Sequence, residues 1–213
     1  MVRRMSFDWK AMGAAAYVPV VTLLGLIAFF FISPYRGETV SAITFVEILV
    51  PIQMSWWSIF LLQEYLQEEG GETLFSYPMS RMKIGFLRIF TFWILFMLML
   101  TLFLGGMSYI YGENYFLSMF VQISYQSFFY TWFAFLVMVF LKNTTWAIGI
   151  VFAYATTQIL TNGNLISFIN VYEFNMKLIP VNQLVDPAIH AILLGVVCLI
   201  FAQWELNRLE RYS

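Results

Sequence analysis

Long apolar stretches are the feature that most limits how this chain can fold. Six segments are apolar over a length sufficient for a helix across a membrane. Such a helix needs about 20 residues to cross a hydrocarbon core. Closed barrels are the other spanning solution, but runs this long argue against short strands of alternating polarity. The six predicted spans lie at about 12–33, 41–62, 89–111, 115–141, 145–162 and 187–204.

The composition supports this interpretation. The chain has 213 residues, of which 61% are hydrophobic and 11% charged, whereas roughly a quarter of the residues in a soluble domain are charged. The formal net charge of -1 argues against a nucleic-acid partner. A single cysteine, Cys198, and a single histidine, His190, exclude an internal disulfide and a His/Cys metal site. We therefore expect an all-α membrane protein with residues 1–213 forming one transmembrane domain.

The basic residues predict the orientation. Lys and Arg concentrate on the cytoplasmic side of membrane proteins. With the N-terminus in the cytoplasm, only Arg36 and Lys177 fall outside. The basic residues that fall inside are Arg3, Arg4, Lys10, Arg81, Lys83, Arg88, Lys142, Arg208 and Arg211. This bias predicts that both termini are cytoplasmic, and we interpret the first apolar stretch as a retained span because it is too long for a typical signal peptide.

Two of the predicted spans are irregular. The second contains Glu47, Pro51 and Gln53, and the fourth is long enough to tilt or to project beyond the bilayer. Between the fifth and sixth spans lies a long loop, 163–186, that is partly apolar. The Asn-Gly-Asn run at 162–164 predicts a turn at the start of this loop.

The most informative segment is the cytoplasmic connection from Gln63 to Phe90. An acidic cluster is followed by Gly70-Gly71, which is expected to end the second span, and then by Pro78, which disfavours helix before it. Ser80 is a good N-cap for the helix that continues into the third span. The segment can be interpreted as a solvated connector with basic anchors, or as a compact docking element at the membrane face.

This segment resembles the signature of type-2 ABC transporter permeases. The matching residues are Glu68-Glu69-Gly70-Gly71-Glu72-Thr73-Leu74, followed by Tyr77-Pro78-Met79-Ser80-Arg81. About 20 residues match at motif level. They lie between the second and third of six spans in a chain with a cytoplasmic N-terminus, so the resemblance extends to the whole predicted topology.

The resemblance implies a function and a set of partners. The segment would be a coupling helix that sits in a groove of a separate ABC ATPase subunit, which binds the ATP and Mg²⁺ that this chain does not. A second permease subunit, identical or homologous, would complete the transporter in the cell membrane, with a bacterial plasma membrane the expected location. The cargo of such permeases is often a peptide, an antibiotic or a lipophilic compound. By resemblance, the contact and hinge positions are Glu68, Glu69, Glu72, Pro78, Ser80 and Arg81.

Polar residues inside the spans suggest alternatives. Glu47 is expected near the outer interface, but an acid within a span can also line a substrate path or couple to protons. Gln122 and Gln126 share one helical face and are expected to pack helices together rather than to contact a substrate. The sequence contains no phosphate-binding loop, so we expect no enzyme activity in this chain. An ion-driven transporter, an assembly factor and an intramembrane enzyme using Glu47 and His190 remain the alternatives.

Overall fold

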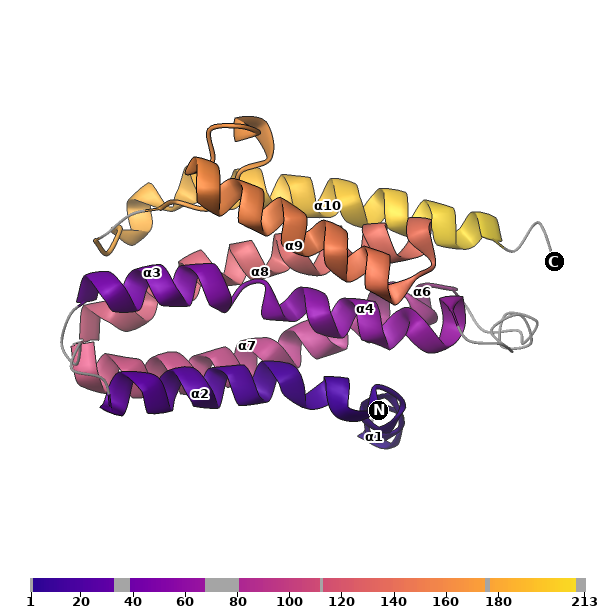
Figure 1. Cartoon of the computed structure of the whole chain (residues 1–213), viewed down its shortest axis with the longest axis horizontal. Coiled ribbons are helices and arrows are strands. Elements are labelled where there is room, and N and C mark those ends of the chain that lie inside the picture. The colour runs from indigo at the N-terminus through magenta and orange to yellow at the C-terminus, as the bar shows by residue number, and fades with distance from the viewer. Residues whose placement is uncertain (1, 33–38, 68–80, 112, 175–176, 210–213) are drawn as a thin grey trace.

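The chain forms a bundle of helices that run along one common axis (Figure 1). This computed structural model describes residues 2–32, 39–67, 81–111, 113–174 and 177–209. The described residues are helical or irregular, without strands. The long helices are α2 (Val18–Ile32), α3 (Thr39–Leu49), α4 (Gln53–Leu66), α7 (Phe86–Tyr111), α8 (Glu113–Leu141), α9 (Thr144–Thr161) and α10 (Val185–Arg208). The short ones are α1 (Val2–Ala11), α6 (Arg81–Ile84) and the 3₁₀ turns η1 (Gly13–Tyr17), η2 (Ser167–Ile169) and η3 (Val181–Gln183).

Five stretches of the described chain are long and apolar enough to cross a membrane, which is compatible with a multi-pass membrane protein. They are Gly13–Phe30, Ile43–Leu66, Arg81–Tyr109, Tyr115–Leu141 and Val185–Arg208. The predicted fifth span, 145–162, forms the 18-residue helix α9 but is not among them. Its C-terminal half carries Thr156, Thr157 and Gln158, which lower its apolar character. The sixth crossing therefore stays a prediction.

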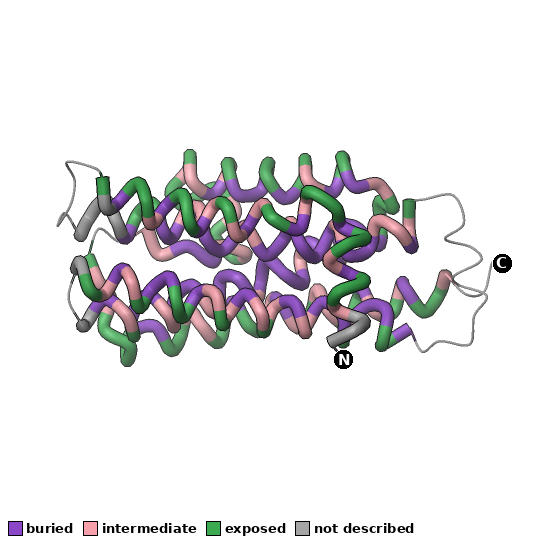
Figure 2. The backbone as a smooth tube through the Cα atoms, turned by 90° about the horizontal axis from the view of Figure 1, so that it is seen from below, coloured by how far each residue is buried: buried purple, intermediate pink, exposed green. Residues whose placement is uncertain are grey.

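Helix α8 is the centre of the bundle. It packs against α4, α7, α9 and α10, while α2 and α10 lie on opposite sides. The inner segments are mostly buried and the outer helices expose one face (Figure 2). At 29 residues, α8 is about 44 Å long, which agrees with the prediction that the fourth span exceeds the thickness of a bilayer core.

The predicted second span is broken at Pro51. Helix α3 ends at Leu49 and α4 begins at Gln53, because Pro51 has no N–H to donate to the carbonyl four residues earlier. The Gln53 side chain donates to the Leu49 carbonyl oxygen at 3.2 Å. A side-chain donor at this point satisfies a backbone group that the break would otherwise leave without a partner, as lipid requires.

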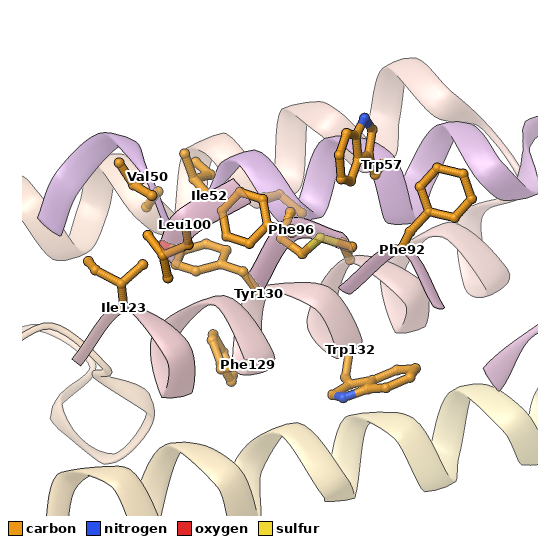
Figure 3. Close-up of a cluster of buried hydrophobic side chains, with 14 of the residues drawn as sticks. Val50, Ile52, Trp57, Phe92, Phe96, Leu100, Ile123, Phe129, Tyr130 and Trp132 are labelled. Carbon is orange, nitrogen blue, oxygen red and sulfur yellow. The ribbon is translucent and has the colours of Figure 1, made fainter. Parts of the chain in front are cut away.

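Aromatic side chains fill the space between the helices (Figure 3). Trp57 on α4 packs edge-on against Phe92 and Phe96 on α7, with ring centroids 5.5 and 6.4 Å apart. Its indole nitrogen donates to the carbonyl of Ala16 at 2.9 Å, which joins η1 to α4. Since lipid is as apolar as these side chains, close packing rather than exclusion of water holds such helices together.

Two glycines permit the closest helix contacts. A Cβ on Gly195 of α10 would lie 2.9 Å from the ring of Phe128 on α8. A Cβ on Gly85, between α6 and α7, would lie 2.9 Å from both Leu206 on α10 and Phe135 on α8. Small residues at such positions let helices approach closely in a membrane. The start of the third apolar segment is therefore fitted tightly against α8 and α10.

One end of the bundle collects most of the basic residues. This basic end contains α1, α6, the turn between α8 and α9, and the C-terminal end of α10 (Figure 1). Helix α1 lies across the bundle axis there, as an interfacial helix does. The described basic residues of this end are Arg3, Arg4, Lys10, Arg81, Lys83, Arg88, Lys142 and Arg208, while Lys177 lies in the loop that precedes α10 at the other end.

Candidate functional site

Most of the predicted docking segment lies outside the described residues. This part contains Glu68, Glu69, Glu72, Pro78 and Ser80. The structure does describe both points at which the segment joins the bundle, Gln67 after α4 and Arg81 at the start of α6. The contacts of Gln67 and Arg81 determine which helices a movement of the segment would displace.

The first junction is bonded to a different helix. The Gln67 carbonyl Oε1 accepts a hydrogen bond from the backbone N–H of Thr144 at 2.8 Å and another from its hydroxyl. Thr144 is the first residue of α9, where backbone N–H groups lack partners within the helix. Asn143 caps the same helix by accepting from the N–H of Trp146 at 3.1 Å. The end of α4 is thus tied to the beginning of α9.

The second junction is packed into the interior. Arg81 is only 7% exposed, and its carbonyl accepts from the N–H of Gly85 at 2.9 Å. The N–H of Ile89 in turn donates to the carbonyl of Gly85 at 3.2 Å, so helical bonding continues from α6 into α7. Arg81 therefore lies buried at the base of a continuous helical rod.

Polar side chains of the opposite half of the bundle meet at Glu47. This residue is 2% exposed, and its Oε1 accepts from the backbone N–H groups of Glu173 at 2.6 Å and Phe174 at 3.3 Å. The side-chain amide of Gln126 donates to the same oxygen at 3.2 Å and to the Val171 carbonyl at 3.0 Å. Glu47 thus holds the loop after α9 against α3 and α8.

The same loop is fastened to the bundle at several further points. The Tyr130 and Tyr172 hydroxyls are 2.6 Å apart, and the Tyr154 hydroxyl donates to the Ile169 carbonyl at 2.6 Å. The Tyr125 hydroxyl donates to Oε1 of Glu173 at 3.2 Å. Burial raises the pKa of the Glu173 carboxyl, and the hydrogen bond from Tyr125 opposes that rise. The loop, which the sequence analysis described only as partly apolar, is therefore a packed part of the fold.

The two glutamines differ in their bonding. Gln126 is fully buried and joined to Glu47, but its own Oε1 has no hydrogen-bond partner among the described residues. Gln122, one turn away and 2% exposed, has an Nε2 likewise without a partner in that part of the chain. Buried amide atoms without a hydrogen-bond partner are uncommon in folded proteins, and a water molecule or other polar group between the helices would satisfy them. The predicted packing role of Gln122 and Gln126 stays a prediction, and the bond from Gln126 to Glu47 joins α8 to α3.

An ion pair joins α1 to the bundle. Asp8 and Arg88 are 5% and 4% exposed, and a carboxylate oxygen lies 3.0 Å from a guanidinium nitrogen. The same guanidinium lies over the ring of Tyr65 at 4.8 Å, a distance at which a cation is attracted to an aromatic face. Helix α1 is thus fixed by charge to α7 beside the end of α4.

Sequence reasoning found some of these residues and missed others. It singled out Glu47, Gln126 and Arg81, and the structure brings the first two into contact. It missed Asp8, Tyr125, Glu173 and Gln67, because their partners lie between 48 and 80 residues away in the chain. His190 is exposed on α10, whereas Glu47 is buried and accepts hydrogen bonds from loop N–H groups. The described residues contain no group of three or more His, Cys, Asp or Glu side chains able to hold a metal ion.

Comparison with protein-family models, with curated proteins and with solved structures gives no match to this chain.

Proposed function

We propose that this chain is the membrane-spanning permease subunit of an ATP-driven exporter. The observation that carries the proposal is the segment Glu68–Arg81, with its acidic cluster, its two glycines and its Pro-Met-Ser-Arg turn. It connects two helical segments that are each apolar enough to span a membrane. The sequence has no phosphate-binding loop, so the ATP and Mg²⁺ belong to a separate ABC ATPase subunit.

The contacts at the two junctions supply a mechanical argument. A push on the segment acts through Gln67 on both α4 and α9, because Gln67 is bonded to Thr144. It also acts through Arg81 and Gly85 on α7, which is wedged there against α8 and α10. Packed elements of this kind shift as rigid bodies rather than deform. ATP binding in the partner would therefore change the arrangement of most of the bundle.

The exposed apolar surface supports the proposed lipid and permease partners. Helix α10 exposes a row of apolar side chains that includes Ile189, Leu193 and Phe201, and α2 exposes Val21 and Leu24 on the opposite side. These surfaces suit lipid or a second permease subunit, identical or homologous. The cargo class that we propose is a peptide, an antibiotic or a lipophilic compound, moved out of a bacterial cell or excluded for immunity.

Co-purification with a candidate ABC ATPase, expressed together with this chain, tests the docking role. We expect Glu69→Ala combined with Glu72→Ala, and separately Pro78→Ala, to reduce both recovery of the ATPase and its stimulated activity. Lys177→Ala, in the loop at the opposite end, is the matched control and should change neither. Full recovery and full activity with the acidic and proline variants would contradict the proposal.

Coupling and docking can then be separated. Gln67→Ala removes the bonds to Thr144 but leaves residues 68–81 unchanged, so the ATPase should still bind while its activity no longer responds to cargo. If cargo stimulated the ATPase equally in this variant and in the wild type, movement of the segment would not be transmitted through α4 and α9.

A second candidate function is transport driven by an ion gradient. It is favoured by the position of Glu47, which lies one turn before Pro51 at the break between α3 and α4. The carboxylate of Glu47 accepts a hydrogen bond from the side-chain amide of Gln126. Broken helices with polar groups at the break are typical of ion-coupled transporters. Uptake into vesicles that depends on a pH gradient, needs no ATP and is lost in Glu47→Gln would favour this function over the first.

A further inference from the structure

The carboxyl group of Glu47 is hydrogen-bonded through only one of its oxygens. Its Oε1 accepts from the backbone N–H groups of Glu173 at 2.6 Å and Phe174 at 3.3 Å, and from the side-chain amide of Gln126 at 3.2 Å. Its Oε2 accepts no hydrogen bond from a described residue. An ionised carboxylate has two equivalent oxygens that both accept, whereas a protonated carboxyl has one C=O that accepts and one O–H that donates. The uneven bonding of Glu47 is the pattern of the protonated form.

The position of Glu47 also disfavours a charge. The residue is 2% exposed and lies within Ile43–Leu66, a segment apolar enough to span a membrane. It forms no salt bridge with a described residue. An ionised carboxylate that is buried without a counterion is so unfavourable that the group usually takes up a proton instead. Glu47 therefore needs a positive charge that the described part of the chain does not bring to it.

The titratable groups around Glu47 cannot supply that charge. Those that interact with its carboxyl group are Glu173 and Tyr172 of the loop after α9 and Tyr125 of α8. The Tyr172 hydroxyl is bonded in turn to that of Tyr130. From α2, two aromatic rings pack against α3. The named side chains are neutral or acidic, and two carboxyl groups that lie close together do not readily ionise at the same time.

The side chain of Gln126 offers the acceptor that a protonated Glu47 needs. Its Nε2 donates to Oε1 of Glu47 at 3.2 Å and to the Val171 carbonyl at 3.0 Å, so both amide hydrogens are used. Its Oε1 is buried and has no hydrogen-bond partner among the described residues, although buried polar atoms of folded proteins are nearly always bonded. The two polar atoms of an amide are about as far apart as the two oxygens of a carboxyl. Two such groups that are bonded along one edge can therefore close a second bond along the other.

We propose that Glu47 is a proton-binding site, with the proton on Oε2 and donated to Oε1 of Gln126. Acid and amide then form a closed pair, in which the N–H of Gln126 donates to the C=O of Glu47 and the O–H of Glu47 donates to the C=O of Gln126. The pair joins α3 to α8, and the loop N–H groups of Glu173 and Phe174 hold the same carbonyl oxygen. The inference rests on neither proposed function, because the pair forms whether or not cargo or ions are transported.

Infrared difference spectroscopy of the full chain, purified in detergent at neutral pH, tests the protonation of Glu47. The probe is the C=O stretch of a protonated carboxyl, which is separate from the bands of carboxylates and of the amide backbone. It moves to lower frequency in heavy water, where O–H becomes O–D. We expect the wild type to show a band that is lost in Glu47→Gln and kept in Glu173→Gln, the matched change at the neighbouring acid. A wild-type spectrum without this band, or one that Glu47→Gln leaves unchanged, would overturn the proposal.

A second pair of variants tests the role of the amide. Gln126→Leu leaves the protonated Glu47 without the donor and the acceptor of Gln126, so its C=O band should move to higher frequency. Gln122→Leu is the matched control, because Gln122 is buried one turn earlier on the same helix, and it should leave the band in place. An unchanged band in Gln126→Leu, or an equal change in both variants, would contradict the pairing.

Binding of a metal cation at the same place gives a different result. In that case sodium chloride would raise the melting temperature of the wild type more than choline chloride at the same concentration, and Glu47→Gln would remove the difference. This outcome would overturn the proposal, because Oε2 would then bind sodium rather than a proton. Equal melting temperatures in the two salts are the result that we expect.

Discussion

The two halves of the bundle each bury an acidic side chain but neutralise it differently. Asp8, at the basic end, is paired with the cation of Arg88 at 3.0 Å. Glu47, in the opposite half, receives N–H groups from Glu173, Phe174 and Gln126 and forms no salt bridge with a described residue. Removing one partner of a buried ion pair is costly, because the other charge stays buried without a counterion. An acid that accepts hydrogen bonds from amides can be replaced by a neutral acceptor, which keeps some of those hydrogen bonds.

This difference has a functional meaning. The pair at the basic end joins side chains of two helices, α1 and α7, and uses no main-chain group of a loop. The Glu47 bonds instead require a particular backbone path through residues 171–174, since they use main-chain N–H groups. Loss of these bonds would free the loop without separating the helices. We therefore expect local effects around Glu47 and global effects around Asp8.

The largest effect is expected from Asp8→Ala, which leaves the Arg88 guanidinium buried without its counterion. Removal of one partner of a buried pair costs about 3–5 kcal/mol. The melting temperature of the purified protein in detergent should fall markedly, and Asp8→Ala combined with Arg88→Met should recover much of the loss because it removes the charge left behind. Lys10→Gln, an exposed change on the same helix, is the control. A double variant as unstable as the single one would show that charge pairing is not the cause.

A smaller and more local effect is expected from Glu47→Ala. It leaves the N–H groups of Glu173 and Phe174 and the amide of Gln126 without their acceptor, at about 1–3 kcal/mol for an unsatisfied buried group. Limited proteolysis should cut the loop 163–180 much faster, with little change in melting temperature. Glu47→Gln keeps a carbonyl acceptor and should lie between the wild type and Glu47→Ala. Identical cleavage rates in all three would indicate that Glu47 does not hold the loop.

Gly163→Ala should destabilise the beginning of the loop by about 1–2 kcal/mol. Gly163 has φ +74°, and an added Cβ would lie 2.5 Å from the side chain of Asn170. Gly25→Ala is a suitable control, because Gly25 lies within α2 with nothing within 4 Å of an added Cβ and alanine favours helix. The measurement is again the melting temperature, and we expect it to fall for Gly163→Ala but not for Gly25→Ala. Equal stability of the two would mean that the turn tolerates a side chain.

The smallest effect concerns pH. Burial raises the pKa of Glu173 above its ordinary value of 4.5, although the hydrogen bond from Tyr125 opposes this. The folded loop therefore binds the proton more tightly than the unfolded chain, so this contribution to stability is complete below pH 4.5 and is lost as the pH rises through the raised pKa. Glu173→Gln mimics the protonated form. It should match the wild type in acid and melt at a higher temperature at alkaline pH.

Comparison of the two proteins at each pH removes the contribution of titrating groups that do not interact with Glu173. A constant difference in melting temperature across the pH range would contradict the role of Glu173.

Local patterns in the sequence predicted most of the helices. The apolar runs predicted α2, α7, α8 and α10, and the Asn-Gly-Asn pattern predicted the turn after α9, where Asn162 has φ +48°. The polar residues of the second apolar run were noted, and the structure resolves them into a break at Pro51. Helix α9 formed as predicted, but it is not among the segments apolar enough to span.

The candidate sites were only partly predictable. Glu47 and Gln126 were identified from their polarity inside apolar segments, but nothing local indicates that residues 171–174 return to them. The same holds for Gln67 with Thr144 and for Asp8 with Arg88, which are 77 and 80 residues apart. Pairing over such distances depends on which helices become neighbours, and a single sequence carries no direct signal of that.

The sequence by itself determined that this is an apolar helical chain with most of its basic residues near predicted helix ends on one side, because hydropathy and charge act on each segment separately. Only the tertiary structure decided that α8 is central, and that one buried acid is held by a cation and the other by loop amides. The physical reason is that hydrogen bonds, ion pairs and close packing exist only between surfaces that the fold has brought together.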